Sequence, residues 1–399
     1  MCSARILQKP GGCLAFFVLV WLLFGFLSLG PAAFIFLYMR KRSERSWPTK
    51  VDGDYKPRVS VLVPTYNESS IILFKLTNLS RLKYPKNLIE VIVVDSNSSD
   101  DTVEVVRKFS EREPRLNMKI LVEKDRRGKS HALNYALGHC NGDVIVVSDA
   151  DCFWPSDILE KSMPFLADPS VGAISGPKIL LNSNQTWVTR MEESYLRSAN
   201  VLRLGESKVG STVFFEGGFS AFKRKAFDGF DPYGTGSDDC GTVICVIENN
   251  FRTMLVPEAG FYSTFPESFR GKLSIKLRRA NQLVRVFAKY LDLLFKGKVK
   301  VTKRTVVPNT LLYLLSPVAF VVFMILTVFL VFNFPLLLVI SAFLIVPKIR
   351  FYFGEIFESN MLLLAAVFGV VVGKGFSVWS KPEDRMLLTK ETLSQFNLI

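Results

Sequence analysis

The chain has 399 residues, of which 49% are hydrophobic, and a formal net charge of +14. Its mean hydropathy of +0.25 excludes an ordinary soluble enzyme and predicts membrane-spanning segments. The positive charge does not indicate a nucleic-acid partner, because twelve Lys or Arg lie between Arg270 and Arg304 beside a single acidic residue, Asp292. Such a basic stretch next to an apolar segment is typical of binding to membrane lipids with anionic headgroups.

Apolar segments are expected to cross the membrane near both ends of the chain. Residues 14–39 carry no charge, and at about 1.5 Å per residue they can cross a hydrocarbon core of about 30 Å. Residues 311–332 form a second run, 336–346 begin a third, and 361–379 form a fourth, for which a helix at the membrane interface is the open alternative. Basic residues flank the inner ends of the first two spans, so the region between them is predicted to be cytoplasmic.

The cytoplasmic region alternates strands and helices. Consecutive apolar positions predict strands buried on both faces, as in a parallel sheet, and the hydrophobic period changes repeatedly between that of a strand and that of a helix. We therefore predict an α/β domain with a mixed, mostly parallel sheet. The predicted strands are 59–63, 91–94, 119–122 and 144–148, and the predicted helices are 69–82, 102–110, 129–138 and 155–166.

Two further helices are predicted after this region. The first, at 185–204, has large apolar residues at helical spacing, which favours core packing. The second, at 273–294, is basic and carries a long apolar stripe, and such a helix is expected to lie on a membrane surface. The core positions predicted on the first helix are Trp187, Met191, Tyr195 and Leu202.

Histidine and cysteine offer little chemistry in this sequence. His131 and His139 share one predicted helix, which leaves no credible histidine partner for a nucleophile. The six cysteines stand singly without a CxxC pair, which favours reduced thiols over disulfides or zinc. Carboxylates must therefore carry any catalysis.

Acidic residues gather where the predicted strands end. Asp149 and Asp151 directly follow a buried strand, and side chains at i and i+2 of an extended segment share a face. Parallel sheets place ligands outside the carboxyl ends of their strands, and carboxylates with phosphate oxygens suit a hard divalent cation such as Mn²⁺ or Mg²⁺. Glu68 and Asp95 follow two other strands. The open alternative is that these acids only cap helices.

Four short motifs occur in order along the α/β region: Pro64-Thr65-Tyr66-Asn67-Glu68, Val94-Asp95-Ser96, Gly128-Lys129 with Ala132-Leu133-Asn134, and Asp149-Ala150-Asp151. Their order and spacing resemble the signatures of family 2 inverting glycosyltransferases, which have the Rossmann-like GT-A fold. The flanking helices resemble the membrane-bound, cellulose-synthase-like and dolichyl-phosphate mannosyltransferase-like branch. The resemblance implies five parts: an N-terminal transmembrane helix with its basic flank (1–50), a cytoplasmic GT-A catalytic domain (51–268), amphipathic interfacial helices (269–304), C-terminal transmembrane helices (305–380) and a short tail (381–399).

The resemblance also implies roles for these residues. Glu68 and Asp95 would hold the nucleoside, and Lys129 would lie near the nucleotide. Asp149 would lie at the ribose and the metal, and Asp151 would bind the divalent cation. Pro64 and Tyr66 complete the nucleotide-sugar-binding motifs.

The family's catalytic base is the last residue of an acidic triplet, which Ser237-Asp238-Asp239 resembles. Asp239 would therefore remove the proton of the acceptor hydroxyl. Asp238 stands where the family usually has Glu, as an accessory acid. The alternative is that Asp239 only caps the helix predicted at 240–248.

The family's final signature, QxxRW, is degraded in this chain. Gln282 and Arg285 match it, but Val286 replaces the Trp, and an offset alignment uses Arg278 and Arg279 instead. Either choice places guanidinium groups near the diphosphate. Loss of the aromatic platform argues against a processive polysaccharide synthase.

These features together predict transfer of a single sugar, most plausibly mannose from GDP-mannose, to a lipid-linked acceptor at the cytoplasmic face in glycan assembly. The acceptor would be dolichyl or polyprenyl phosphate, or a lipid diphosphate-linked saccharide. Two alternatives stay open: a processive synthase that uses a UDP-sugar, and a non-catalytic membrane subunit that binds a sugar nucleotide. The sequence does not identify protein partners.

Overall fold

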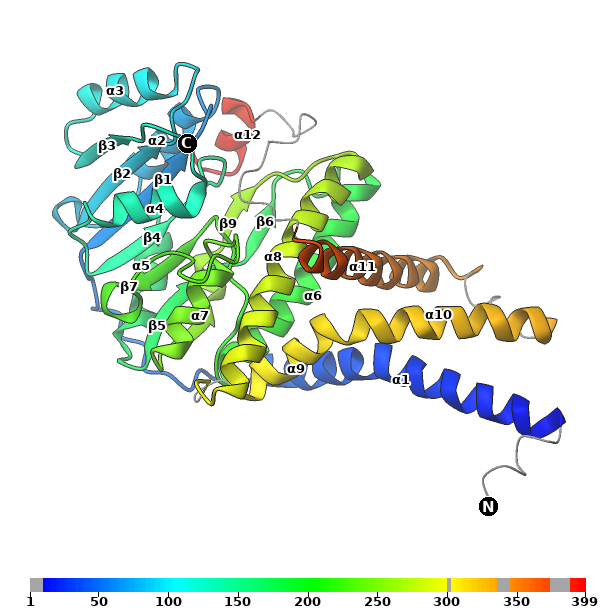
Figure 1. Cartoon of the computed structure of the whole chain (residues 1–399). Coiled ribbons are helices and arrows are strands. Elements are labelled where there is room, and N and C mark those ends of the chain that lie inside the picture. Colours follow the sequence, from blue (N-terminus) through cyan, green and yellow to red (C-terminus); the bar gives the residue numbers. More distant parts are fainter. Residues whose placement is uncertain (1–9, 300–302, 336–344, 374–387) are drawn as a thin grey trace.

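The computed structural model describes residues 10–299, 303–335, 345–373 and 388–399. Figure 1 shows an α/β domain from which long helices project to one side. This arrangement agrees with the fold predicted from the alternation of apolar strands and amphipathic helices.

A seven-stranded sheet in the order β3-β2-β1-β4-β7-β5-β8 forms the centre of the domain. β7 is antiparallel to both of its neighbours, and the other pairs are parallel. The sheet is therefore mixed and mostly parallel, as predicted. The strands are β1 (Val59–Thr65), β2 (Ile89–Asp95), β3 (Met118–Val122), β4 (Val144–Val147), β5 (Val171–Ser175), β7 (Ser220–Lys223) and β8 (Arg252–Leu255), and a separate pair joins β6 (Lys178–Leu180) to β9 (Phe261–Ser263).

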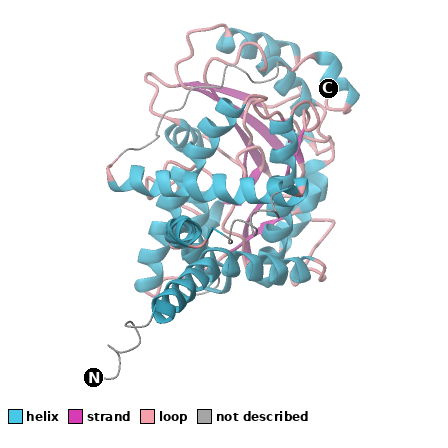
Figure 2. Cartoon of the chain, turned by 90° about the vertical axis from the view of Figure 1, so that its right-hand side faces the viewer, coloured by secondary structure: helices cyan, strands magenta, loops and turns pink. Residues whose placement is uncertain are grey.

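Helices cover both faces of the sheet (Figure 2). Successive side chains of a strand point to opposite faces, and β1 shows this directly. Val61 and Val63 pack in one core cluster with residues of α2, α3 and α5, whereas Leu62 packs in a second with residues of α4, α7 and α8. The helices are α2 (Ile72–Ser80), α3 (Thr102–Arg112), α4 (Lys129–Leu137), α5 (Ile158–Ser162), α7 (Cys240–Glu248) and α8 (Phe269–Phe295).

The prediction of one continuous helix at 155–166 was wrong. The structure has the short helix α5 followed by a 3-10 helix, η3 (Met163–Ala167). Pro164 lies in this segment, and proline has no backbone N–H to continue an α-helical ladder. Pro155 precedes α5 instead of occupying its first turn.

Helix α6 (Trp187–Val209) forms as predicted, but its buried face differs from the predicted one. Trp187 is 53% exposed and stacks on Phe269, so its assignment to the core was wrong. Charged residues occupy part of the buried face: Arg203 pairs with Glu216 at 2.8 Å. Apolar spacing alone did not identify this face, because buried ion pairs take positions that a hydrophobicity pattern assigns to solvent.

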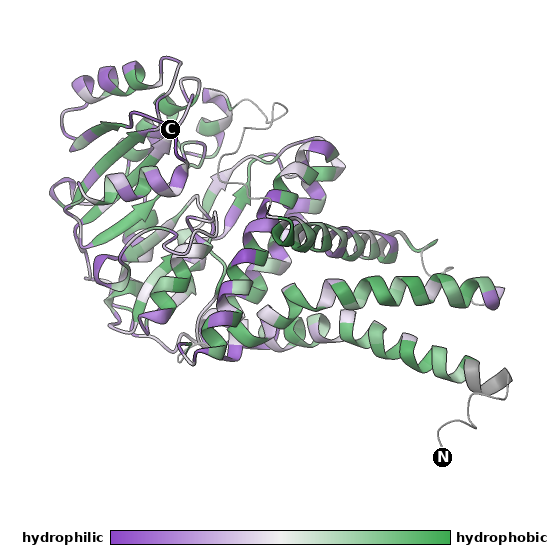
Figure 3. Cartoon of the chain, in the orientation of Figure 1, coloured by the Kyte–Doolittle hydropathy of each residue, from purple (hydrophilic) through white to green (hydrophobic). Residues whose placement is uncertain are grey.

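Within the part of the chain that the structure describes, three helices are long and apolar enough to cross a membrane: Leu14–Ser43, Lys303–Asn333 and Tyr352–Val371. Figure 3 shows them as apolar along most of their length. They belong to α1 (Pro10–Ser43), to α9 (Lys303–Leu314) with α10 (Ser316–Asn333), and to α11 (Pro347–Val371). The predicted span at 336–346 lies almost wholly outside the described residues. Residues 374–379 of the span predicted at 361–379 also lie outside them. The helix that contains the rest of this second span, α11, begins earlier than predicted, at Pro347.

The middle of the apolar stripe of α8 packs against protein, whereas Leu291 of the same stripe is 37% exposed, so the predicted place of this helix at the membrane surface stays a prediction. Phe287 packs in the core of the α/β domain, and Ala280 and Val284 pack against Ala366 of α11. An ion pair of 2.7 Å between Lys272 and Glu358 also joins α8 to α11. Helix α8 therefore connects the α/β domain to the membrane region.

The close contact between α1 and α6 yields a stability prediction. A Cβ at Gly205 would lie 2.2 Å from the backbone oxygen of Met39. Gly205→Ala should push the helices apart and lower the free energy of unfolding by about 1–3 kcal/mol, as overpacking does. Thermal unfolding in nanodiscs measures this, with Gly53→Ala as the control, since a Cβ at Gly53 meets no atom within 4 Å. Equal melting temperatures for the two variants would contradict the prediction.

Candidate active site

The predicted acidic residues lie where parallel strands end at one edge of the sheet. β1 pairs in parallel with β2, with Thr65 opposite Asp95, and with β4, with Leu62 opposite Val147. The carboxyl ends of these strands therefore meet at this edge. Asp149 and Asp151 follow β4 directly.

Lys129 connects this edge to the loop before α7. Its Nζ lies 2.6 Å from Oδ1 of Asp149 and 2.8 Å from Oδ2 of Asp238. Burial opposes the charge on Lys129, but the two carboxylates outweigh it and raise the pKa of the ammonium above its ordinary value. Gly128, directly before Lys129, has a φ of 101°, a conformation that favours glycine.

Asp239 is the N-cap of α7. Its Oδ1 accepts hydrogen bonds from the backbone N–H of Cys240, at 2.6 Å, and from the Ser237 hydroxyl. The capping role that was left open is therefore present, and the role of Asp239 as base stays a prediction. Burial raises the pKa of the neighbouring Asp238 carboxyl to about 6; Lys129 opposes this rise, and the nearby Asp239 and Asp149 add to it.

The basic residues of α8 have different surroundings. Burial and Arg279 lower the pKa of Arg278, whereas Asp149, Asp238 and Asp239 oppose this, so Arg278 lies in the field of the site carboxylates. Arg279 interacts mainly with Glu216 and Glu192, with its guanidinium 3.9 Å from Glu192. Arg285 donates a hydrogen bond to Oδ1 of Asn281, on the same helix, at 3.2 Å. Gln282 donates a hydrogen bond to the Gly236 carbonyl, in the loop before α7.

The predicted nucleoside residues lie at the ends of β1 and β2. Asp95 is buried, and its carboxylate accepts hydrogen bonds from the Thr65 hydroxyl at 3.0 Å and from the Ser98 N–H at 2.8 Å. Pro64 is in β1, and the Glu68 N–H donates to Thr102 Oγ1 at 2.8 Å. The guanidinium of Arg126 lies 3.6 Å from the centre of the Tyr66 ring.

Sequence reasoning missed a lysine beneath the Asp149-Ala150-Asp151 turn. Lys75 of α2 is fully buried, and its Nζ donates to Ser148 Oγ and to the Cys152 carbonyl, both at 2.6 Å. It therefore ties together the two ends of the turn. Burial lowers the pKa of Lys75 to about 7. The available signal was a lysine among apolar residues on the buried side of a predicted helix.

Gly217 was also missed. A Cβ there would lie 2.9 Å from Lys129 Nζ and 3.0 Å from Asp149 Oδ2. A larger residue would push against the ion pair, so this position requires close backbone approach.

The turn after β4 offers a ligand set for a divalent cation. Ligand atoms of Asp149, Asp151 and Cys152 lie within 4.8 Å of one another. Burial raises the pKa of the Cys152 thiol to about 12, which leaves the two carboxylates as the effective donors. An oxygen-rich set fits a hard ion such as Mn²⁺ or Mg²⁺ better than a soft one.

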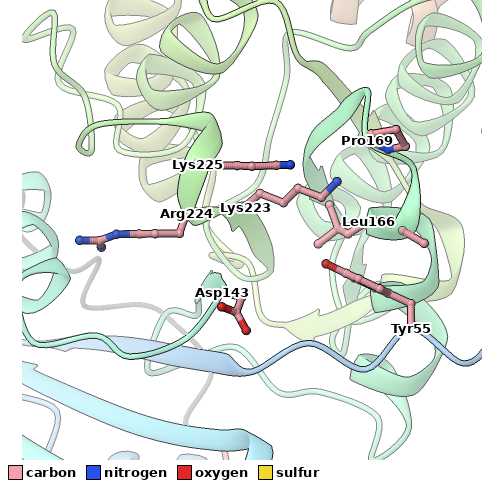
Figure 4. A pocket seen from close by; sticks show the side chains of 8 residues that line it. Tyr55, Asp143, Leu166, Pro169, Lys223, Arg224 and Lys225 are labelled. Atoms are coloured by element: carbon pink, nitrogen blue, oxygen red, sulfur yellow. The ribbon is translucent and has the colours of Figure 1, made fainter.

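A cavity of about 460 Å³ lies elsewhere in the domain (Figure 4). Tyr55, Asp143 and Lys223 contribute to its lining. Asp143 precedes β4, whereas Asp149 follows it, so this cavity is at the opposite end of the strand from the acidic cluster. It is not part of the candidate site.

Comparison with known proteins places the chain among sugar transferases. A family model described as glycosyltransferase like family 2 matches residues 57–282. An N-acetylglucosaminyltransferase of Rhizobium meliloti (strain 1021) is 29% identical over 57% of this chain and 56% of that protein. A beta-monoglucosyldiacylglycerol synthase of Synechocystis is 33% identical over 43% of this chain and 36% of that protein. The chain spans about half the length, or less, of these curated relatives.

A solved structure resembles nearly the whole chain. It is a mannosyltransferase from Pyrobaculum calidifontis in complex with GDP-Man and Mn²⁺, with a TM-score of 0.77 and 30% identity. The match covers 90% of this chain and 99% of that one. The similarity therefore includes membrane-side helices as well as the α/β domain.

The raised pKa of Asp238 predicts a pH-dependent difference in stability. Its folded-state pKa of about 6 exceeds the ordinary carboxyl value of about 3.9, so the stability it contributes is present at low pH and lost as the pH rises through 6. Asp238→Asn lacks this titration. Between pH 5 and 7.5, the unfolding free energy of the variant should therefore rise relative to wild type, as followed by denaturant titration.

The exposed Asp125→Asn is the matched control for this measurement, because Asp125 lies outside the acidic cluster. A difference between Asp238→Asn and wild type that is the same at both pH values would show that the Asp238 pKa is not raised.

Proposed function

Because the chain belongs to family 2 of the glycosyltransferases, we propose that it is a membrane-bound inverting enzyme that transfers a single sugar to a lipid-linked acceptor. The donor is GDP-mannose, and the reaction takes place at the cytoplasmic face. The observation that supports this most is the pair of ion pairs that Lys129 makes with Asp149 and Asp238. They hold the proposed binding site for the metal and the diphosphate next to the loop that carries the candidate base.

The chemistry assigns one task to each group. Asp239 takes the proton from the acceptor hydroxyl as its oxygen bonds to the anomeric carbon, and the bond from that carbon to the diphosphate breaks on the opposite side. Arg278 and Lys129 offset the negative charge on the departing nucleoside diphosphate. A bound Mn²⁺ or Mg²⁺ would be held by Asp151 and Asp149 and would supply further positive charge there. Glu68 and Asp95 hold the nucleoside, with Pro64 and Tyr66 beside them.

Different relatives support the donor and the acceptor. The Pyrobaculum mannosyltransferase structure holds GDP-Man and Mn²⁺, which supports a GDP-mannose donor. The Synechocystis relative is a monoglucosyldiacylglycerol synthase by name, and three of the described helices can cross a membrane; both support a lipid acceptor. The rhizobial N-acetylglucosaminyltransferases favour an N-acetylglucosaminyl donor as the second candidate.

Charge and chain direction support a cytoplasmic domain. Arg40, Lys41 and Arg42 end α1 on the side of the α/β domain, as the positive-inside rule requires. Residues 388–399 pack on this same domain, which requires an even number of crossings after it. Among the described residues, the span formed by α9 and α10, together with α11, can supply two crossings.

Product analysis tests this function. The full chain would be reconstituted in vesicles with dolichyl phosphate and a panel of labelled sugar nucleotides. Label from GDP-mannose should enter the lipid-extractable fraction with inverted anomeric configuration, and a chelator should stop the transfer. Label found only in a water-soluble polymer, or only as free sugar, would exclude single transfer to a lipid.

Substitution of Asp239 separates its role as base from its role as cap. Asp239→Asn keeps the size of the side chain but accepts no proton, so transfer should fall by about 10²–10⁴-fold, with donor binding by calorimetry little changed. Because Asn caps helices about as well as Asp, the melting temperature should stay close to wild type.

Asp101→Asn makes the same substitution directly before α3, where the Asp101 side chain makes no capping hydrogen bond, and should leave both transfer and the melting temperature intact. A folded Asp239→Asn variant that binds donor and transfers at the wild-type rate would remove Asp239 from the mechanism and make Asp238 the candidate base.

A further inference from the structure

Phe153 lies two residues beyond Asp151, and a distant part of the chain covers it. Leu393, Leu398 and Ile399 form a buried cluster with the fully buried Phe153. Leu393 belongs to α12 (Lys390–Gln395), which Figure 1 shows beside α2 on the α/β domain. Residues 388–399 are called the docking segment below.

A single buried side chain bonds both the metal turn and the docking segment. Asn78 of α2 accepts a hydrogen bond from the Trp154 N–H at 2.9 Å and donates to the Trp154 carbonyl at 2.8 Å. The same amide nitrogen donates to the Leu398 carbonyl at 2.7 Å. The backbone just after the Asp149-Ala150-Asp151 turn and the docking segment therefore share one fixed point.

A second connection runs through Tyr262. Its backbone N–H and carbonyl each bond to Phe153 at 2.8 Å, and its ring lies 5.7 Å from that of Phe396 in the docking segment. Beneath the turn, Lys75 bonds to the Cys152 carbonyl. The backbone from Cys152 to Trp154 is thus held from α2, from β9 and from the docking segment.

We propose that the docking segment is a positioning element of the metal site: by fixing Phe153 and Trp154 it holds Asp151 in place for the divalent cation. The inference rests on the proposed function, because that function assigns the metal to Asp151. The segment lies C-terminal to α11 in the chain, and α11 is the last of the described helices that are long and apolar enough to cross a membrane. Residues that orient metal ligands commonly alter metal affinity about 10–100-fold when changed.

Undocking the segment tests this without changing any residue of the turn. Leu393→Asp places a charge in the buried cluster, which is costly enough to release the segment into solvent. The full chain in nanodiscs would be titrated with Mn²⁺ alone, and free Mn²⁺ would be followed by its EPR signal. Affinity should fall by about 10–100-fold, with the catalytic domain still folded by circular dichroism.

Matched variants isolate the effect. Gln395→Asp adds the same charge on the exposed face of α12 and should bind Mn²⁺ as wild type does. Val106→Ala, on the buried face of α3, destabilises the domain without touching the docking segment and should also keep wild-type affinity. Phe396→Ala removes only the exposed ring beside Tyr262 and should weaken Mn²⁺ binding in the same direction as Leu393→Asp, but less.

Asp151→Asn distinguishes failure of the inference from failure of the proposed function. If wild type binds Mn²⁺ more tightly than Asp151→Asn, but Leu393→Asp and Phe396→Ala bind within twofold of wild type, the docking segment does not position the metal site and the proposed function stands. If Val106→Ala weakens binding as much as Leu393→Asp does, the effect is general destabilisation and the inference is likewise overturned. If wild type and Asp151→Asn bind equally, both are overturned.

Discussion

The two-sided ion pair of Lys129 is the interaction on which the site depends. Asp149 and Asp238 come from separate parts of the chain, and two carboxylates this close would repel without a cation between them. Lys129 can bridge them because α4 begins at the sheet edge and Gly217 leaves room beside its ammonium. Arg278 adds a second cation from α8, the helix that also packs against the membrane region. The candidate site and the long apolar helices are therefore connected through α8.

Much of the α/β domain could be predicted because its strands are uninterrupted apolar runs with turn residues between them. β1, β2 and β4 lie where the apolar runs do, and α4 and α7 begin at the predicted residues. Two predictions were wrong for different reasons. The helix predicted at 155–166 is interrupted near Pro164. The buried face of α6 was predicted from hydrophobicity alone, but it carries the charged residue Arg203. The packing of Ala280 and Val284 of α8 against α11 could not be predicted, because composition does not distinguish a protein contact from a lipid contact.

The acidic residues that follow β1, β2 and β4 were identifiable because the ends of parallel strands meet at one edge of the sheet, whereas Asp238 and Asp239 were identified only through the family resemblance. Lys75 and Gly217 were not identified from the sequence. Lys75 is a buried cation beneath the turn, and Gly217 matters only because it has no side chain to push against Lys129 and Asp149. Spacing alone could not choose among Arg278, Arg279 and Arg285, because the face that α8 presents to the site is set by its packing. The structure places Arg278 in the field of Asp149, Asp238 and Asp239.

We propose that sugar transfer occurs between the Asp149-Ala150-Asp151 turn and the loop carrying Asp238 and Asp239. The most direct measurement is an experimental structure of the full chain in a lipid nanodisc with GDP-mannose and Mn²⁺. The metal should be bound by the Asp151 carboxylate, with the diphosphate near Lys129 and Arg278 and the anomeric carbon facing Asp239. A donor bound instead in the cavity beside Tyr55 and Lys223, or a metal without Asp151 among its ligands, would contradict the claim.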